Sequence, residues 1–234
     1  MNPFRKHEQP KKPSKPDALD PTRASEDPEK PDSEMEEDFP APTVSSRRYH
    51  VFHRRNLNLA VTTDEKGEQQ VYFVRTSSFT PNIPDISLHA GADRDAPIAA
   101  VAKFIHFSAD VKIGLGDPDN PNIAWEELKR QTWNNSEYTW EMTFGERPRH
   151  ERRTFVWKRT HRVGIDDEQL IKSSNRNFKL LDPQTGELLA VFASAGLNLR
   201  KCGKFQINVD YGKDFDTLVI LTALTLYEKQ RRRS

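Results

Sequence analysis

The 234-residue sequence contains one cysteine, Cys202. A single cysteine excludes an intramolecular disulfide and a cysteine-rich zinc site, and it predicts a reducing, intracellular compartment. Lys201 and Lys204 lie next to Cys202 and could lower its pKa, although an isolated cysteine beside a strand more often has a structural role. The amino-terminal segment lacks the apolar region of a signal peptide, which argues against secretion.

The sequence also lacks an apolar run long enough to span a membrane. The longest candidate is the run of thirteen residues from Phe215 to Tyr227, in which every residue but Asp216 is apolar or threonine. A transmembrane helix takes about 17 to 25 residues. A buried helix, a buried strand and a membrane anchor are the three interpretations. Because a helix apolar on all sides is usually buried on all sides, we favour a buried helix over 214–229, with Asp214 as its N-cap, followed by a basic tail at 231–234. Its threonines can bond carbonyls three or four residues back.

Catalytic and metal-binding motifs are missing as well. No Gly-x-Ser-x-Gly occurs, and the three-residue offset of His50 and His53 places them on opposite faces of a strand, which makes them a poor metal pair. The segment GLGDPDNPN (114–122) fits neither a dinucleotide loop nor an EF-hand and is interpreted as an ordinary loop. Glu126 and Glu127, on a helix predicted at 123–131, point in different directions and form no acid/base pair. We therefore expect a non-enzymatic protein without cofactor or metal.

Proline and charge are concentrated at the start of the chain. Residues 1–45 hold nine of the sixteen prolines, with 11 acidic and 7 basic residues, a composition that predicts a disordered arm. Ser25 and Ser33 precede carboxylates, a context that acid-directed kinases favour, although most serines in such arms carry no regulatory meaning. Residues 46–234 have 29 basic and 24 acidic residues, a net charge of +5, which is too small to predict specific nucleic-acid binding.

From residue 46 onward, short alternating runs rich in aromatic and β-branched residues predict about ten to twelve strands. Hairpins are expected where Gly67 and Gly186 can adopt the positive φ of a tight turn. Many strands at a spacing of roughly ten residues favour a single closed barrel or sandwich. The predicted strands are 47–53, 57–63, 69–76, 98–107, 109–115, 137–144, 153–160, two flanking 183–186, and 204–209.

An apolar helix after a long series of strands suggests a barrel with the helix through its middle. The segments that carry this pattern are NFKLLDPQTGELLAVF, KFQINVD and DFDTLVILTALTLYEKQRRR. With them the chain resembles the tubby C-terminal-like group, which includes tubby proteins, phospholipid scramblases and LURP-one-related proteins. The resemblance covers roughly 46–230 and implies a closed antiparallel barrel of about twelve strands around a central hydrophobic C-terminal helix. VYFVRT, RRTFVWKRTH and the chain's ending are most similar to an uncharacterised fungal branch of that group.

One basic stretch, 147–162, is the candidate binding site. On a strand, Phe155, Trp157 and Arg159 share one face and Lys158 the other, so an inward aromatic face would direct Lys158 and the flanking arginines outward. Arginine suits phosphate oxygens, and tubby proteins hold phosphoinositide head groups with basic barrel residues; the alternative is a solvated barrel face. The candidate ligands of an anionic head group are Arg147, Arg149, Arg152, Arg153, Lys158, Arg159 and Arg162.

The predicted function is a non-enzymatic module that binds anionic phospholipid, with phosphoinositide as the expected head group, at the membrane surface. The alternative is a soluble intracellular interaction or regulatory scaffold whose partners bind residues 1–45. The scramblase palmitoylation cysteines and calcium segment have no counterpart in this chain, which argues against scramblase chemistry. The expected location is the cytoplasm or the membrane surface, with the nucleus as an alternative because of the tail KQRRRS.

Overall fold

The computed structural model of this chain describes residues 46–78, 80–81, 83–145, 150–165, 176–196 and 198–233. The predicted disordered arm at 1–45, with Ser25 and Ser33, therefore lies outside the described residues, as do Arg147 and Arg149 of the basic stretch.

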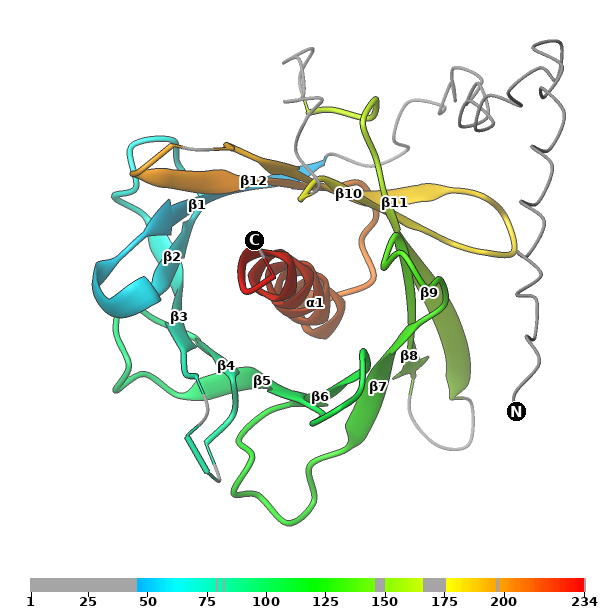
Figure 1. The fold of residues 1–234 in the computed structure, drawn as a ribbon, viewed down its shortest axis with the longest axis horizontal. Coiled ribbons are helices and arrows are strands. Elements are labelled where there is room, and N and C mark those ends of the chain that lie inside the picture. The colour runs from blue at the N-terminus through cyan, green and yellow to red at the C-terminus, as the bar shows by residue number, and fades with distance from the viewer. Residues whose placement is uncertain are drawn as a thin grey trace, which may run out of the picture. The chain divides into compact units, whose positions relative to one another are not determined.

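The described chain forms a closed antiparallel barrel around one α-helix, as predicted (Figure 1). Each strand pairs with its neighbours in the chain, and β1 also pairs with β12 to close the sheet. The elements are β1 (Arg47–His53), a 3-10 helix η1 (Arg55–Leu57), β2 (Leu59–Thr62), β3 (Gln70–Thr76), β4 (Ile86–His89), β5 (Ile98–Phe104), β6 (Val111–Leu115), β7 (Trp125–Arg130), β8 (Glu137–Phe144), β9 (Glu151–Arg159), β10 (Phe178–Leu181), β11 (Leu188–Ser194), β12 (Lys201–Ile207) and α1 (Lys213–Arg231).

Both predicted hairpins are present. The turn with Gly67 joins β2 to β3, and the turn with Gly186 joins β10 to β11. The φ angles of Gly67 and Gly186 are 80° and 75°, in the left-handed region that glycine adopts without a Cβ clash.

Two elements differ from the sequence predictions. The helix predicted at 123–131 is wrong: Trp125–Arg130 is β7, paired antiparallel with β6 and β8. Its backbone hydrogen bonds to two neighbouring strands outweigh the weak helical propensity of the segment. The prediction also missed β4 (Ile86–His89), a four-residue strand that is buried throughout and too short to show a clear alternation.

Helix α1 lies inside the barrel, as Figure 1 shows in a view along the helix. Every residue from Phe215 to Lys229 is buried, which confirms the interpretation as a buried helix. The hydroxyls of Thr217, Thr222 and Thr225 donate to carbonyls four residues back, over 2.7 to 2.8 Å, as the sequence predicted. Searched over the described residues, no helix combines the length and the apolarity that crossing a membrane requires.

The predicted N-cap of α1 is wrong. The helix begins at Lys213, its N-cap is Gly212, and no side chain caps it. Gly212 has a φ of 89°, which lets the chain turn sharply from the wall into the interior. Asp214 is the second residue of the helix, and Asp216 lies in the same first turn. A carboxylate in the first turn still complements the positive end of the helix dipole.

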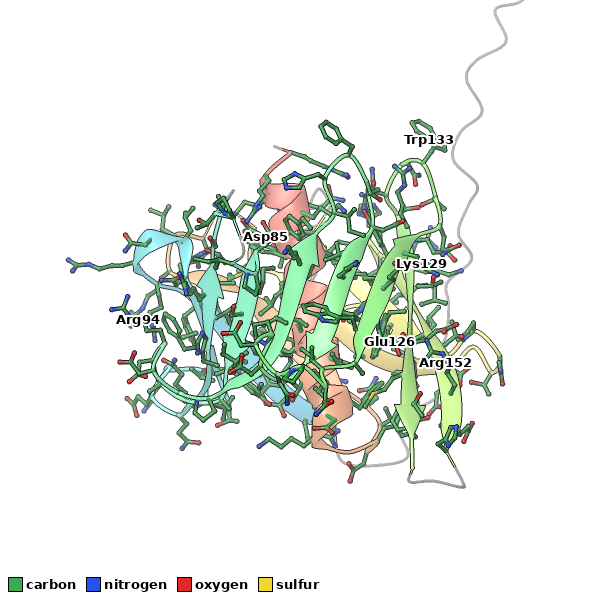
Figure 2. All side chains as sticks on the ribbon, turned by 90° about the horizontal axis from the view of Figure 1, so that it is seen from below. Asp85, Arg94, Glu126, Lys129, Trp133 and Arg152 are labelled. Carbon is green, nitrogen blue, oxygen red and sulfur yellow. The ribbon has the colours of Figure 1, made fainter. Side chains whose placement is uncertain are left out.

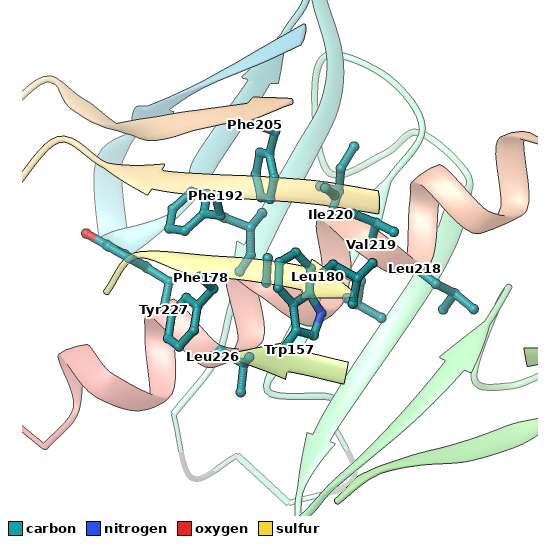
Figure 3. Packing of buried hydrophobic residues seen from close by; sticks show 14 of the residues in the cluster. Trp157, Phe178, Leu180, Phe192, Phe205, Leu218, Val219, Ile220, Leu226 and Tyr227 are labelled. Atoms are coloured by element: carbon teal, nitrogen blue, oxygen red, sulfur yellow. The ribbon is translucent and has the colours of Figure 1, made fainter. Parts of the chain in front are cut away.

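Large aromatic side chains fill the space between α1 and the wall. Phe192 and Phe205, from β11 and β12, have ring centroids 4.7 Å apart, and Tyr227 of α1 packs edge-on to Phe192 at 5.8 Å. Nearby, the indole Nε1 of Trp157 donates to Thr222 over 2.9 Å, so its buried N–H is satisfied. Figure 3 shows these rings between the strands and the helix.

Candidate functional site

The basic stretch runs along the wall of the barrel instead of forming one cluster. Phe155 and Trp157 face the interior, as expected, and Lys158 is half-exposed. β9 has nine residues, and at about 3.3 Å per residue the Cα atoms at its two ends lie about 26 Å apart. Arg152, near its start, and Arg162, beyond its end, are therefore at opposite ends of the barrel.

The basic side chains in the middle of this stretch already have carboxylate partners. Arg152 donates to both oxygens of Glu126 at 2.8 and 2.6 Å and to Glu141 at 2.7 Å, which raises the pKa of Arg152. Figure 2 shows Arg152 beside Glu126. Two more residues are paired in the same way: Arg153 with Glu151 at 2.8 Å, and Lys158 with Glu137 at 3.6 Å. An outside anion would have to compete with these carboxylates.

Arg159 and Arg162 lie at the other end of β9. Arg159 is half-buried and donates through Nη2 to the carbonyl of Asn135 over 3.3 Å, and burial lowers its pKa. Arg162 is exposed in the loop after β9. The structure thus brings only these two of the described candidates toward a common end of the barrel.

The described residues at the two ends of the barrel differ in charge. Because every strand is antiparallel to the next in the chain, successive loops alternate between the ends. At one end, where α1 begins, the described loop residues are 63–69, 90–97, 116–124, 145, 150, 182–187 and 208–212. At the other end, where α1 ends, the described loop residues are 54–58, 77–78, 80–81, 83–85, 105–110, 131–136, 160–165, 176–177, 195–196 and 198–200.

Among the described residues of these loops and of the adjoining turns of α1 (213–216 and 228–233), charge separates almost completely. The end where α1 begins has twelve Asp or Glu against three Lys or Arg. The end where α1 ends has three Asp or Glu against nine Lys or Arg. We call them the acidic end and the basic end. The nine are Arg54, Arg55, Arg162, Arg176, Arg200, Lys229, Arg231, Arg232 and Arg233.

A pocket of about 650 Å³ opens at the basic end, between α1 and the loops that flank β4 and β5. Lys103, Arg232 and Arg233 are among its lining residues. Arg232 is held in place, since it bonds Asp85 at 3.0 Å, Glu228 at 2.8 Å and the carbonyl of Ser77 at 2.7 Å. Lys103 and Arg233 are exposed, so they are the cations of this pocket that face solvent.

Lys229 forms the inner wall of the same pocket. Its ammonium donates to the carbonyl of Ala109 and lies 5.7 and 5.9 Å from the ring centroids of Phe104 and Tyr138. Burial lowers the pKa of Lys229 to about 8. The group is therefore mostly protonated at neutral pH and loses its charge in a range where exposed lysines keep theirs.

The pocket at the acidic end, about 520 Å³, has a structural explanation. Arg47 makes a bidentate pair with Asp216, at 2.7 and 2.8 Å, and also bonds the carbonyl of Val209. Tyr49 lies beside them, and burial raises its pKa to about 12. These groups tie β1 to the first turn of α1.

The remaining sequence candidates have local roles. In the loop after β6, the backbone N–H of Asp119 donates to the side chain of Asp117 over 3.0 Å. The backbone N–H of Asn122 donates to the side chain of Asn120 over 2.9 Å. These polar side chains therefore stabilise their own turns. Over the described parts of the chain, no group of three His, Cys, Asp or Glu side chains could hold a metal ion.

Cys202 is buried in β12, and its burial raises the pKa of the thiol to about 12. The suggestion that neighbouring cations lower this pKa is therefore wrong, because loss of hydration of the thiolate outweighs the opposite effect of Arg176 and Arg231. We expect native protein to resist a maleimide near neutral pH and to react once unfolded in guanidinium. Mass spectrometry would follow the adduct, with the exposed Gln184 replaced by cysteine as the control site that reacts in the folded state. Rapid native labelling of Cys202 would contradict the prediction.

No protein-family model matches the sequence, and no curated protein matches it. Among solved structures, the chain is similar to an Arabidopsis thaliana protein determined by X-ray crystallography, with 15% sequence identity and a TM-score of 0.42. The likeness covers 79% of this chain and 93% of the plant protein.

Proposed function

We propose that this protein is a non-enzymatic module that binds anionic phospholipid head groups, phosphoinositides included, with the basic end of the barrel. The observation that carries the proposal is the separation of charge between the described residues of the two ends. A molecule whose cations gather at one end orients itself toward a negative surface, because the opposite acidic end is repelled.

The exposed arginines of the basic end are free to meet such a surface. Among the described residues, no carboxylate pairs with the guanidinium of Arg55, Arg162 or Arg200, and all three side chains are exposed. A lysine or arginine close to an anionic membrane contributes about 1 kcal/mol of binding free energy, so several together give strong, salt-sensitive attraction. The wall arginines, by contrast, would first have to leave their carboxylate partners.

Co-sedimentation with vesicles tests the proposal. We expect the full chain to pellet with phosphatidylcholine vesicles that contain phosphatidylserine or phosphatidylinositol 4,5-bisphosphate, to stay in the supernatant with pure phosphatidylcholine, and to be released by added salt. Replacing Arg54 and Arg55 by Glu should weaken binding about tenfold or more. Equal partitioning onto neutral and anionic vesicles would exclude this function.

The matched control makes the same change of charge at the other end. Lys66 and Arg94 lie in loops of the acidic end and are both exposed. Lys66→Glu with Arg94→Glu changes the net charge by the same amount as the double substitution of Arg54 and Arg55. This control should bind like the wild type. A third variant, Arg152→Ala with Arg153→Ala, tests the wall: loss of binding in it alone would move the head-group site from the basic end to β9.

A further inference from the structure

Exposed apolar side chains gather at the same end as the basic residues. Five large apolar side chains are strongly exposed among the described residues, and four of them belong to loops of the basic end. Each of the four lies in a different loop, and the fifth, Trp125, is on the wall in β7. The four and their exposed fractions are Leu57 (56%), Phe107 (111%), Trp133 (87%) and Leu199 (95%).

Two of these residues have a backbone conformation that residues other than glycine rarely adopt. Phe107 has a φ of 59° and Leu57 a φ of 64°, a left-handed conformation that disfavours side chains with a Cβ. Both loops are also closed by backbone hydrogen bonds. The N–H of Ser108 donates to the carbonyl of Ile105 over 3.1 Å, and the backbone N–H of Arg54 donates to the carbonyl of Asn58 over 2.8 Å. Short, bonded turns therefore hold these apolar side chains out in water.

The loop of Trp133 is closed in the same manner. Thr132 Oγ1 accepts the backbone N–H groups of Ser136 and Glu137 at 3.0 and 3.1 Å, and Asn135 bonds the carbonyl of Thr132 at 3.1 Å. Figure 2 shows Trp133 beyond the ends of the strands, at the end where α1 finishes, while Arg94 lies toward the opposite end. The indole is thus outside the barrel and beside the basic end.

Basic residues adjoin two of these tips, Leu57 and Leu199, in sequence. Arg54 and Arg55 precede Leu57, Arg200 follows Leu199, and the basic end of α1 lies inside the ring of loops. Separate apolar tips around a charged centre differ from the contiguous apolar centre and polar rim of a protein interface. They match the boundary of an anionic bilayer, where aromatic rings enter the head-group region and cations meet phosphates.

From this arrangement we infer that the barrel docks end-on to an anionic bilayer, with Phe107 and Trp133 inserted among the head groups and the basic end facing the phosphates. The inference rests on the proposed lipid binding and adds the orientation and the anchors. Attraction by charge alone would leave both rings in water. Insertion makes part of the affinity insensitive to salt, and removal of either ring should lower binding about tenfold or more.

Fluorescence of Trp133 on vesicles with brominated acyl chains tests the inference. The Trp125→Phe variant retains Trp133 as the exposed tryptophan, since Trp140 and Trp157 are buried. We expect its emission to be quenched on anionic brominated vesicles, and no quenching after a further Trp133→Phe change. Phe107→Ser and Trp133→Ser should each pellet with vesicles about tenfold less well, whereas Trp125→Ser should bind like the wild type.

The outcomes separate the two proposals. Full binding without quenching of Trp133, or undiminished binding by Trp133→Ser and Phe107→Ser, overturns end-on insertion and leaves lipid binding in place. No binding to any anionic vesicle overturns both. Melting curves of each variant exclude loss of fold as the cause of weaker binding.

Discussion

Replacing Leu221 with Asp is expected to leave no folded barrel. Leu221 lies in the middle of α1 and is fully buried by the surrounding wall. The buried Lys229 is eight residues further along α1, about 12 Å away, so a carboxylate at position 221 has no cation beside it. An unpaired buried charge costs several kcal/mol or forces its own protonation. Together with the lost apolar contacts of leucine, this is comparable to the whole stability of a domain, about 5 to 15 kcal/mol.

Leu199→Asp is the matched control for this experiment. The chemical change is the same, but Leu199 is exposed in the loop between β11 and β12, where surface substitutions change stability by about 0.5 kcal/mol or less. Near-ultraviolet circular dichroism and thermal melting would compare the two. A Leu221→Asp variant with a native spectrum and a cooperative melt would show that α1 is not the core of the barrel.

Helix α1 could be predicted because its pattern is local and extreme. Thirteen residues with a single charge, too few to span a membrane, leave burial within a protein as the simplest solution, and the threonine hydroxyls are satisfied by the helix itself. β7 could not be predicted from its sequence, because WEELKR has a single buried residue, Leu128, and so shows no alternation of apolar and polar residues. Its strand conformation comes from pairing with β6 and β8. Pairing of this kind depends on residues that are distant in sequence.

The candidate site could be predicted only in part, for the same reason. Sequence inspection finds charges that are consecutive, so it selected the stretch along β9 and with it Arg159 and Arg162. The basic end combines residues as distant in sequence as Arg54 and Arg233. Apart from the C-terminal tail, these residues do not form a long basic run in the sequence. The order of the loops in the sequence could have revealed the basic end. In a closed antiparallel barrel every second loop lies at the same end, so the charges of alternate loops can be added together.

The charges at the centre of each end also stabilise the helix. Asp214 and Asp216 occupy the first turn of α1, and Lys229 and Arg231 the last, which is the arrangement that the helix dipole favours. This role explains the residues on the helix itself. It does not explain Arg55 or the exposed aromatic rings, which lie in loops of the wall. The loop residues are therefore the ones that the lipid experiments must change.

Two phenylalanines of the chain should respond in opposite ways to truncation. Phe215 is fully buried at the start of α1, with ring centroids 5.1 Å from both Phe155 and Tyr211 and 6.1 Å from Trp140. Phe215→Ala removes a ring that the neighbours cannot replace, so we expect a loss of about 3 to 5 kcal/mol in the free energy of unfolding. Denaturation in guanidinium would measure it, and the fraction that remains folded should bind vesicles normally.

Phe107→Gly should do the reverse. Phe107 has no burial to lose, and glycine adopts its φ of 59° without the cost that a Cβ brings, so the free energy of unfolding should rise by up to about 1 kcal/mol. Vesicle binding should fall, because the inserted ring is gone. A variant that is more stable yet binds less would show that the strained, exposed ring serves binding at the expense of stability. Unchanged binding by Phe107→Gly would instead mean that this ring contributes neither to the fold nor to the membrane contact.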